Sequence, residues 1–173
     1  MNDGAQSADF QLLLDEAACR RVLGRYGPAL DWRDADALAS IVWPDATVDY
    51  GFFKGNGSEY VRTFIEIERA AGRPFHLMVC DRVNVKGSIA EAESVGIALT
   101  METSPDGVVT SRQYWGRYLD ELEKRGSEWR ISKRTYIVHG SFDVAAPASG
   151  SSSFPGLHVA TNLTVEHPMY RKL

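Results

Sequence analysis

The sequence has 173 residues, 44% of them hydrophobic, and its 19 Lys and Arg against 23 Asp and Glu give a formal net charge of −4. A chain of this length forms one domain and buries about 70% of the surface that its unfolded form exposes. Its basic residues are scattered without an interleaved aromatic stripe, which argues against a nucleic-acid partner. We therefore expect the partners to be small molecules or protein.

Signals for membranes, targeting and metals are weak. No apolar run nears the roughly 20 residues that span a bilayer, and residues 1–10 lack the basic and apolar regions of a signal peptide, so we expect a cytoplasmic protein without membrane contact. Cys19 and Cys80 lie outside any CxxC or CxH motif and are predicted to be reduced, buried thiols. The last three histidines have no metal-ligand spacing, so no metal is expected.

Helical periodicity marks three segments in the first part of the chain. Residues 9–27 place apolar side chains on one face, with Asp9 as the expected N-cap. Residues 32–43 form a second, short helix that Pro44 ends. After a β-branched and aromatic segment and a "KGNG" turn, residues 58–72 form a third helix that begins at Ser58.

Beyond Arg73 the pattern changes to long strands. Hairpin signals of Gly, Ser, Pro and Asp separate four apolar segments, which are residues 75–87, 89–102, 108–126 and 128–143. Long antiparallel strands after a run of helices predict an α+β fold, with the helices on one face of a curved, mainly antiparallel sheet.

The chain ends in a segment of different composition. Residues 145–156 are rich in Ser, Ala, Gly and Pro, and apolar residues return afterwards. We divide the chain into a domain over residues 1–144 and a hinge and tail over residues 145–173. Residues 157–170 are predicted to cover a cavity mouth or a neighbouring subunit, although a frayed terminus is the alternative.

Several separated motifs occur together in a familiar order. The segment "ALDWRDADALASIVWPDATVDY" is followed by "FKG", a helix, "PFH" and "EWRISKR". This arrangement resembles the nuclear transport factor 2-like, or SnoaL-like, superfamily, and within it the scytalone dehydratase and hexachlorocyclohexane dehydrochlorinase branch. The likeness covers about residues 10–142. It implies a cone-shaped α+β barrel, no cofactor and a homo-oligomer, with a trimer favoured over a dimer.

The resemblance also implies a site. It places the family's catalytic aspartate at Asp31 and its catalytic histidine at His76. Arg134 matches an arginine of the dehydrochlorinase, Tyr50 matches a tyrosine of scytalone dehydratase, and Tyr26 occupies a helix position that faces the cavity in such enzymes. All three are candidate substrate-binding residues.

Two departures from the pattern argue against the substrates of those two enzymes. A second histidine of scytalone dehydratase has no match near residues 100–103, and Val48 stands where the dehydrochlorinase has a pocket tryptophan.

The chemistry of these side chains fits proton transfer. Histidine takes a proton near neutral pH, and a carboxylate on its other ring nitrogen fixes the tautomer and stabilises the imidazolium. Tyrosine and arginine side chains could hold a developing oxyanion. Asp31 could instead be a helix N-cap. Arg134 could pair across a hairpin with one of three acids, Asp120, Glu121 or Glu128.

Aromatic residues alternate along the last two strands, so one set lines the concave side of the sheet. We include Tyr114 and Trp115 among the candidate substrate-binding residues on this basis, although core packing explains most aromatics in such strands. A cavity of this composition would suit a flat, hydrophobic or aromatic substrate.

Three functions remain open from the sequence. The leading hypothesis is a cofactor-independent lyase that expels water, or formaldehyde from a hydroxymethyl group of a lignin-derived diaryl compound. The second is an isomerase or cyclase of the ketosteroid isomerase or polyketide cyclase type. The third is a noncatalytic binding or assembly module, because folds host both enzymes and binding proteins.

Overall fold

The computed structural model describes residues 3–146 and 163–172. The helices in these residues are α1 (Asp3–Gly24), α2 (Tyr26–Asp31), α3 (Ala35–Ala39) and α4 (Gly57–Ala70). The strands are β1 (Val42–Asp49), β2 (Lys54–Asn56), β3 (Phe75–Lys86), β4 (Ile89–Thr103), β5 (Val109–Arg125) and β6 (Glu128–Ala146). The four long strands lie within three residues of their predicted bounds.

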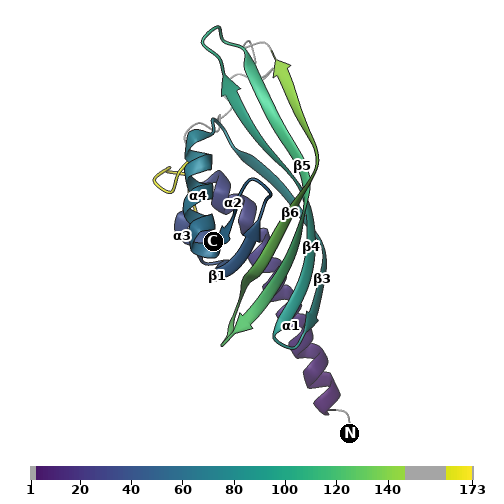
Figure 1. Ribbon diagram of the computed structural model, residues 1–173. Coiled ribbons are helices and arrows are strands. Elements are labelled where there is room, and N and C mark those ends of the chain that lie inside the picture. The colour runs from purple at the N-terminus through teal and green to yellow at the C-terminus, as the bar shows by residue number, and fades with distance from the viewer. Residues whose placement is uncertain (1–2, 147–162, 173) are drawn as a thin grey trace.

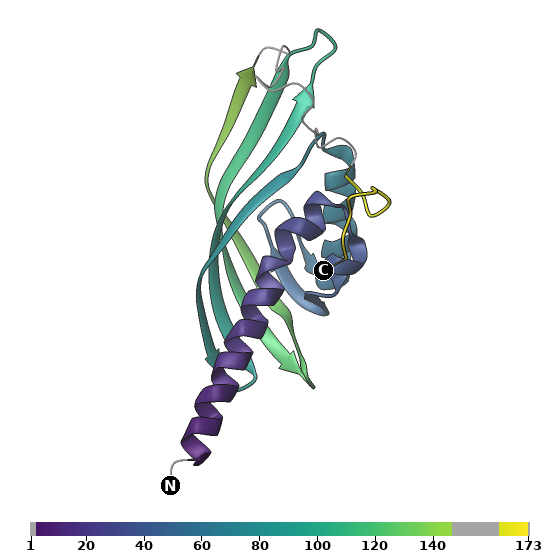
Figure 2. The same ribbon diagram turned by 180° about the vertical axis from the view of Figure 1, so that it is seen from behind.

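The strands form one curved sheet in the order β2-β1-β6-β5-β4-β3. All neighbouring strands pair antiparallel except β1 and β6, which are parallel. The chain crosses from the β1–β2 end of the sheet to β3 at the opposite edge. Helices α2, α3 and α4 lie on one side of the sheet (Figure 1), and α1 runs diagonally along it (Figure 2). The predicted α+β class, with N-terminal helices on a curved sheet, is confirmed, but in the described residues β2 and β3 are the edges of an open sheet, which does not close into a barrel.

Local capping places the helix starts differently from the sequence prediction. Asn56, not Ser58, caps α4: its side chain accepts from the Glu59 backbone N–H, and the Glu59 carboxylate accepts from the Asn56 N–H in return. Asp9 lies inside α1. The predicted helix over residues 32–43 is shorter, because the chain joins the sheet from Val42 onward and Pro44 lies within strand β1.

The core lies between the helices and the sheet, and α2 approaches the sheet closely at one glycine. Buried side chains from both layers include Leu23, Leu30, Leu38, Tyr60, Leu122 and Ile131. A Cβ at Gly27 would lie 3.1 Å from the backbone oxygen of His76, so a side chain there would crowd β3. The glycine therefore lets the first turn of α2 approach the first residues of β3.

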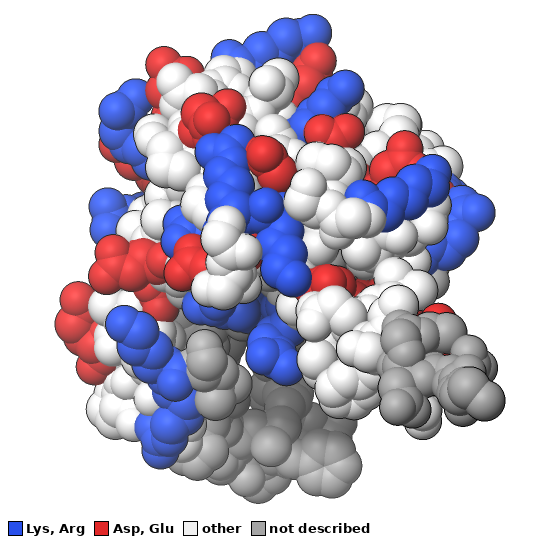
Figure 3. Space-filling view, turned by 90° about the horizontal axis from the view of Figure 1, so that it is seen from below, with Lys and Arg blue, Asp and Glu red and all other residues white. Residues whose placement is uncertain are grey.

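The outer face of the sheet carries exposed apolar side chains. A shallow groove there is lined by Leu77, Val79, Ile97, Trp115, Arg117 and His139. At the end of the molecule seen in Figure 3, acidic and basic side chains are intermixed. The self-association expected from the sequence stays a prediction. No helix in the described part of the chain is long and apolar enough to cross a membrane.

The described tail, residues 163–172, packs beside α3 and α4 (Figure 1). The Arg33 guanidinium donates to the Leu163 carbonyl at 2.6 Å, and the Tyr170 hydroxyl donates to the Asp34 carboxylate. The Trp32 ring contacts the rings of both His167 and Tyr170 at 5.6 Å between centroids. The rest of the predicted cover, residues 157–162, lies outside the described residues, so covering of the cavity mouth stays a prediction.

Removing residues 155–173 is expected to lower the melting temperature, because the aromatic face of Trp32 would be exposed and the buried Asp34 carboxylate would lose a donor. Tyr170→Phe removes only the hydroxyl and is expected to produce a smaller decrease. Differential scanning calorimetry of both variants measures the two contributions, and a truncated chain that melts with the wild type would contradict the prediction.

Candidate functional site

His76 and Asp31, which are 45 positions apart, meet beside a cavity that His76 lines. His76 is the second residue of β3, and Asp31 is the last residue of α2. His76 Nδ1 lies 2.7 Å from Asp31 Oδ1, and the His76 backbone N–H donates to Oδ2 at 3.3 Å. The side chains are only 6% and 15% exposed. The predicted meeting of the two residues is confirmed, while their catalytic role stays a prediction.

The hydrogen bond sets the direction of the imidazole. An ionised carboxylate only accepts hydrogen bonds, so Nδ1 carries the proton and Nε2 is left as the basic nitrogen. The alternative in which Asp31 caps a helix is wrong, because the N-cap of α3 is Asp34, whose Oδ1 accepts from the Ala37 N–H at 2.9 Å. The Asp31 carboxylate is thus directed at His76.

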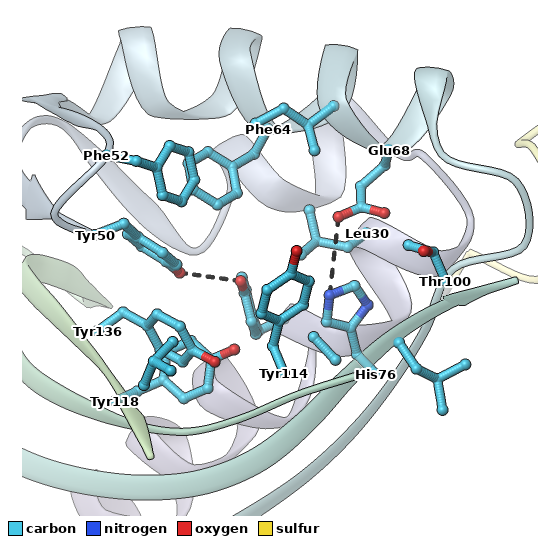
Figure 4. Close-up of a pocket in the computed structure, with 15 residues that line it drawn as sticks. Leu30, Tyr50, Phe52, Phe64, Glu68, His76, Thr100, Tyr114, Tyr118 and Tyr136 are labelled. Carbon is cyan, nitrogen blue, oxygen red and sulfur yellow. Dashed lines mark hydrogen bonds and ion pairs between the residues drawn. The ribbon is translucent and has the colours of Figure 1, made fainter. Parts of the chain in front are cut away.

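The cavity beside His76 has a volume of about 350 Å³ and a mostly apolar wall. Figure 4 shows the lining side chains, which come from α2, α4, the segment after β1 and the four long strands. Aromatic and aliphatic members include Leu30, Phe52, Phe64, Tyr114, Tyr136 and Val138. A space of this size and character fits a small hydrophobic or aromatic molecule.

Tyrosine hydroxyls form a chain that includes Tyr26, whose ring contacts His76 at 6.0 Å between centroids. The Tyr50 hydroxyl lies 3.0 Å from that of Tyr26 and 3.1 Å from that of Tyr60. Burial raises the pKa of both Tyr26 and Tyr50 well above the ordinary value. These hydroxyls keep their protons at neutral pH and remain hydrogen-bond donors. Tyr26 and Tyr50, both predicted from the sequence, line the cavity.

Arg134 lies behind the cavity wall, outside the set of lining residues. Its Nε and one terminal nitrogen each donate to the Asp120 carboxylate at 2.7 Å, so Asp120 is the partner among the three candidates. Burial disfavours the charged guanidinium, but the Asp120 carboxylate outweighs this, and the Arg134 pKa is raised well above its ordinary value. The guanidinium also lies over the rings of Tyr26 and Tyr118, at 4.3 and 4.9 Å.

The alternation of β5 separates the two aromatic residues predicted to bind substrate. Tyr114 lines the cavity, together with Tyr118 four residues later. Trp115 lies on the opposite face, where it is 46% exposed and its ring contacts Phe142. The expectation for Trp115 is therefore corrected, because successive side chains of a strand point to opposite faces of a sheet.

Glu68 is a cavity residue that sequence reasoning missed. It lies on α4, one turn after Phe64 and on the same buried face, with Oε1 at 3.9 Å from His76 Nε2. Burial raises the pKa of Glu68, and the nearby Asp31 carboxylate acts in the same direction, while His76 and Arg33 oppose the shift. The signal was present in the sequence: an acid stood at a buried position of an amphipathic helix.

Gly116 leaves room for the Tyr136 ring in the cavity wall. A Cβ at Gly116 would lie 2.3 Å from the Tyr136 ring, which in turn stacks on Tyr50 at 5.0 Å. Gly116→Ala is expected to displace this ring and to lower the free energy of unfolding by about 1–3 kcal/mol through overpacking. Urea denaturation measures the loss.

Gly24→Ala is the matched control, because nothing lies within 4 Å of a Cβ at that position. It should leave stability unchanged or slightly raised. Equal effects of the two substitutions would contradict the packing role of Gly116.

In the described parts of the chain, residues 3–146 and 163–172, no group of three or more His, Cys, Asp or Glu side chains could hold a metal ion. Cys19 is buried, and burial raises its thiol pKa to about 12, so the thiol stays protonated. Cys80 is a partly buried free cysteine.

Solved structures show the same fold at low sequence identity. A candidate scytalone dehydratase from Novosphingobium aromaticivorans superposes with a TM-score of 0.65 at 20% identity, covering 79% of this chain and 91% of its own. The hexachlorocyclohexane dehydrochlorinase LinA-type3 from Novosphingobium barchaimii has a TM-score of 0.69 at 20% identity, covering 87% and 97%. Rv3472 of Mycobacterium tuberculosis, a protein of unknown function, has a TM-score of 0.63 at 19% identity, covering 74% and 73%.

Sequence comparison is more specific about the family. No curated protein matches the chain. The SnoaL-like domain family matches residues 11–135, which include α2, α4, all of β3 to β5 and the Asp31–His76 pair. A match over this length, on a structure with the expected elements in the expected order, identifies the chain as a member of the SnoaL-like domain family.

Proposed function

We propose that this protein is a cofactor-independent lyase that acts on a small hydrophobic or aromatic substrate. One observation carries the proposal: the Asp31–His76 pair, joined at 2.7 Å, lies at an apolar cavity of about 350 Å³. A histidine base inside an apolar enclosure is well placed to remove a proton from carbon, because competing water is scarce there.

The roles follow from the geometry. His76 Nε2 takes the proton, and the Asp31 carboxylate stabilises the imidazolium that results. Within the hydrogen-bonded pair of Tyr26 and Tyr50 one hydroxyl donates to the other, and the hydroxyl whose proton stays free donates to a carbonyl oxygen as negative charge develops on it. Two of the similar structures carry names of eliminating enzymes, a dehydratase and a dehydrochlorinase, which supports elimination as the reaction type.

The test is turnover of a panel followed by mass spectrometry of the products. The panel contains β-hydroxy aryl ketones, their β-chloro analogues and diaryl 1,3-diols. A product lighter than its substrate by water, hydrogen chloride or formaldehyde supports a lyase. A product of unchanged mass would favour an isomerase or cyclase instead, and binding without any product would favour a binding module.

A further inference from the structure

Glu68 faces the basic nitrogen of His76 across the cavity wall. Its Oε1 lies 3.9 Å from Nε2, and the other carboxylate oxygen, Oε2, is buried with no hydrogen-bond partner. Figure 4 shows the carboxyl group above the imidazole, on the side of the cavity where Thr100 also lies. The side chain is only 9% exposed and lines the same cavity as His76. A buried carboxylate left without donors costs far more free energy than a protonated carboxyl in the same place.

The charged neighbours of Glu68 leave its carboxyl unpaired. Asp31 lies on α2, His76 on β3 and Arg33 between α2 and α3. The hydrogen bonds of the Arg33 guanidinium to the end of α4 and the two residues after it go to backbone carbonyls, those of Glu68 at 2.8 Å, Ala71 at 3.3 Å and Gly72 at 3.1 Å. Arg33 therefore anchors the end of α4 without donating to the Glu68 carboxylate.

We propose that Glu68 is the general acid of the elimination: it donates its proton to a departing hydroxyl group while His76 removes the proton from carbon. The inference rests on the lyase function proposed above and deepens it. It assigns the substrate to the β-hydroxy carbonyl class, because hydroxide is a poor leaving group without a proton, whereas chloride needs none.

The step balances in atoms and electrons. His76 Nε2 takes the proton from the α carbon, and the electron pair of the C–H bond forms the new C=C bond. The bond from the β carbon to oxygen breaks, its electron pair stays on oxygen, and that oxygen takes the Glu68 proton to leave as water. The protein is left with an imidazolium and a carboxylate.

The same two groups can reset themselves. After the elimination, His76 Nε2 carries a proton and Glu68 is a carboxylate. Nε2 and Glu68 Oε1 lie 3.9 Å apart. Transfer of this proton, directly after a small side-chain movement or through one water, restores a neutral imidazole and a neutral acid. No outside proton donor is needed for the next turnover.

Leaving-group dependence tests the role of Glu68. The probes are 3-hydroxy-1-phenylpropan-1-one and 3-chloro-1-phenylpropan-1-one, which give the same enone. Glu68→Gln is expected to lower kcat for the hydroxy compound by about 10²-fold or more and to leave kcat for the chloro compound within about threefold, after the spontaneous rate is subtracted. His76→Gln is expected to lower both.

Other outcomes are equally informative. If Glu68→Gln lowers both reactions alike, or neither, Glu68 is not the acid although the lyase stands. If the wild-type protein converts neither probe nor any member of the panel, the lyase proposal fails and the acid role fails with it.

The protonation of Glu68 is measurable without turnover. Infrared difference spectra between the wild type and Glu68→Gln should contain the carbonyl band of a protonated carboxyl group. Its midpoint on pH titration should lie above the ordinary glutamate value of about 4.3. A midpoint at or below that value would overturn the proposal whatever the kinetics show.

Discussion

Replacing His76 by glutamine is expected to lower kcat/KM for an eliminated substrate by about 10²- to 10⁴-fold, the usual contribution of a positioned general base. Asp31→Asn should produce a loss of similar size. Its amide oxygen can still accept from the His76 backbone N–H, but the amide NH2 group then faces Nδ1. It therefore cannot hold the tautomer in which Nε2 is basic, and it offers no charge that stabilises the imidazolium. Steady-state kinetics on the best substrate of the panel measures both losses.

Two exposed residues provide matched controls for these substitutions. His139→Gln changes a histidine on the outer face of the sheet, and Asp36→Asn changes an acid in the first turn of α3. Neither residue lines the cavity, so both variants should retain wild-type kinetics. Unchanged turnover in His76→Gln and Asp31→Asn would refute the pair as the catalytic base.

Replacing Arg134 by methionine is expected to destabilise the protein by about 3–5 kcal/mol, because it leaves the Asp120 carboxylate buried and unpaired. The two side chains are 1% and 0% exposed, so water cannot replace the lost partner. The rings of Tyr26 and Tyr118 would also lose the cation above them. Urea denaturation should show a lower midpoint with an unchanged slope.

The double substitution Arg134→Met and Asp120→Leu distinguishes charge from packing. Replacing both members of a buried ion pair by apolar residues of similar volume is often neutral, so most of the stability should return. If the single Arg134→Met variant were as stable as the wild type, the pair would not hold the wall of the cavity. If the double variant were as unstable as the single one, the loss of stability would come from the packing of these side chains and not from an unpaired charge.

The buried Glu68 carboxyl makes the stability of the protein depend on pH. Its pKa is raised on folding, so the folded state holds this proton more tightly than the unfolded state does. Stability from this group is therefore present below the unfolded pKa and declines as pH rises through the folded pKa. A residue that weakens the fold at neutral pH, on the wall of a cavity, is typical of a site kept for chemistry.

The sequence by itself determined the order and type of the long elements. Alternating apolar residues and turn residues at Gly87 and Gly126 placed the four long strands, since hydrophobic periodicity and turn chemistry are local properties. It also singled out Asp31 and His76, through motifs whose likeness to a family implied that they meet. The bounds of the short helices were harder to predict. Val42 fits a helical spacing in the sequence, but it is the first residue of strand β1 in the structure.

Only the tertiary structure decided which side chains share the cavity. Alternation put Tyr114 and Trp115 on opposite faces, but the face that receives the helices made Tyr114 the cavity residue. The β5–β6 register selected Asp120 as the partner of Arg134 from three acids. Glu68 became part of the site because α4 packs against β1 and α2, which brings Glu68 beside His76 at the start of β3. Such contacts join residues far apart in the chain, so they depend on packing between elements and not on local pattern.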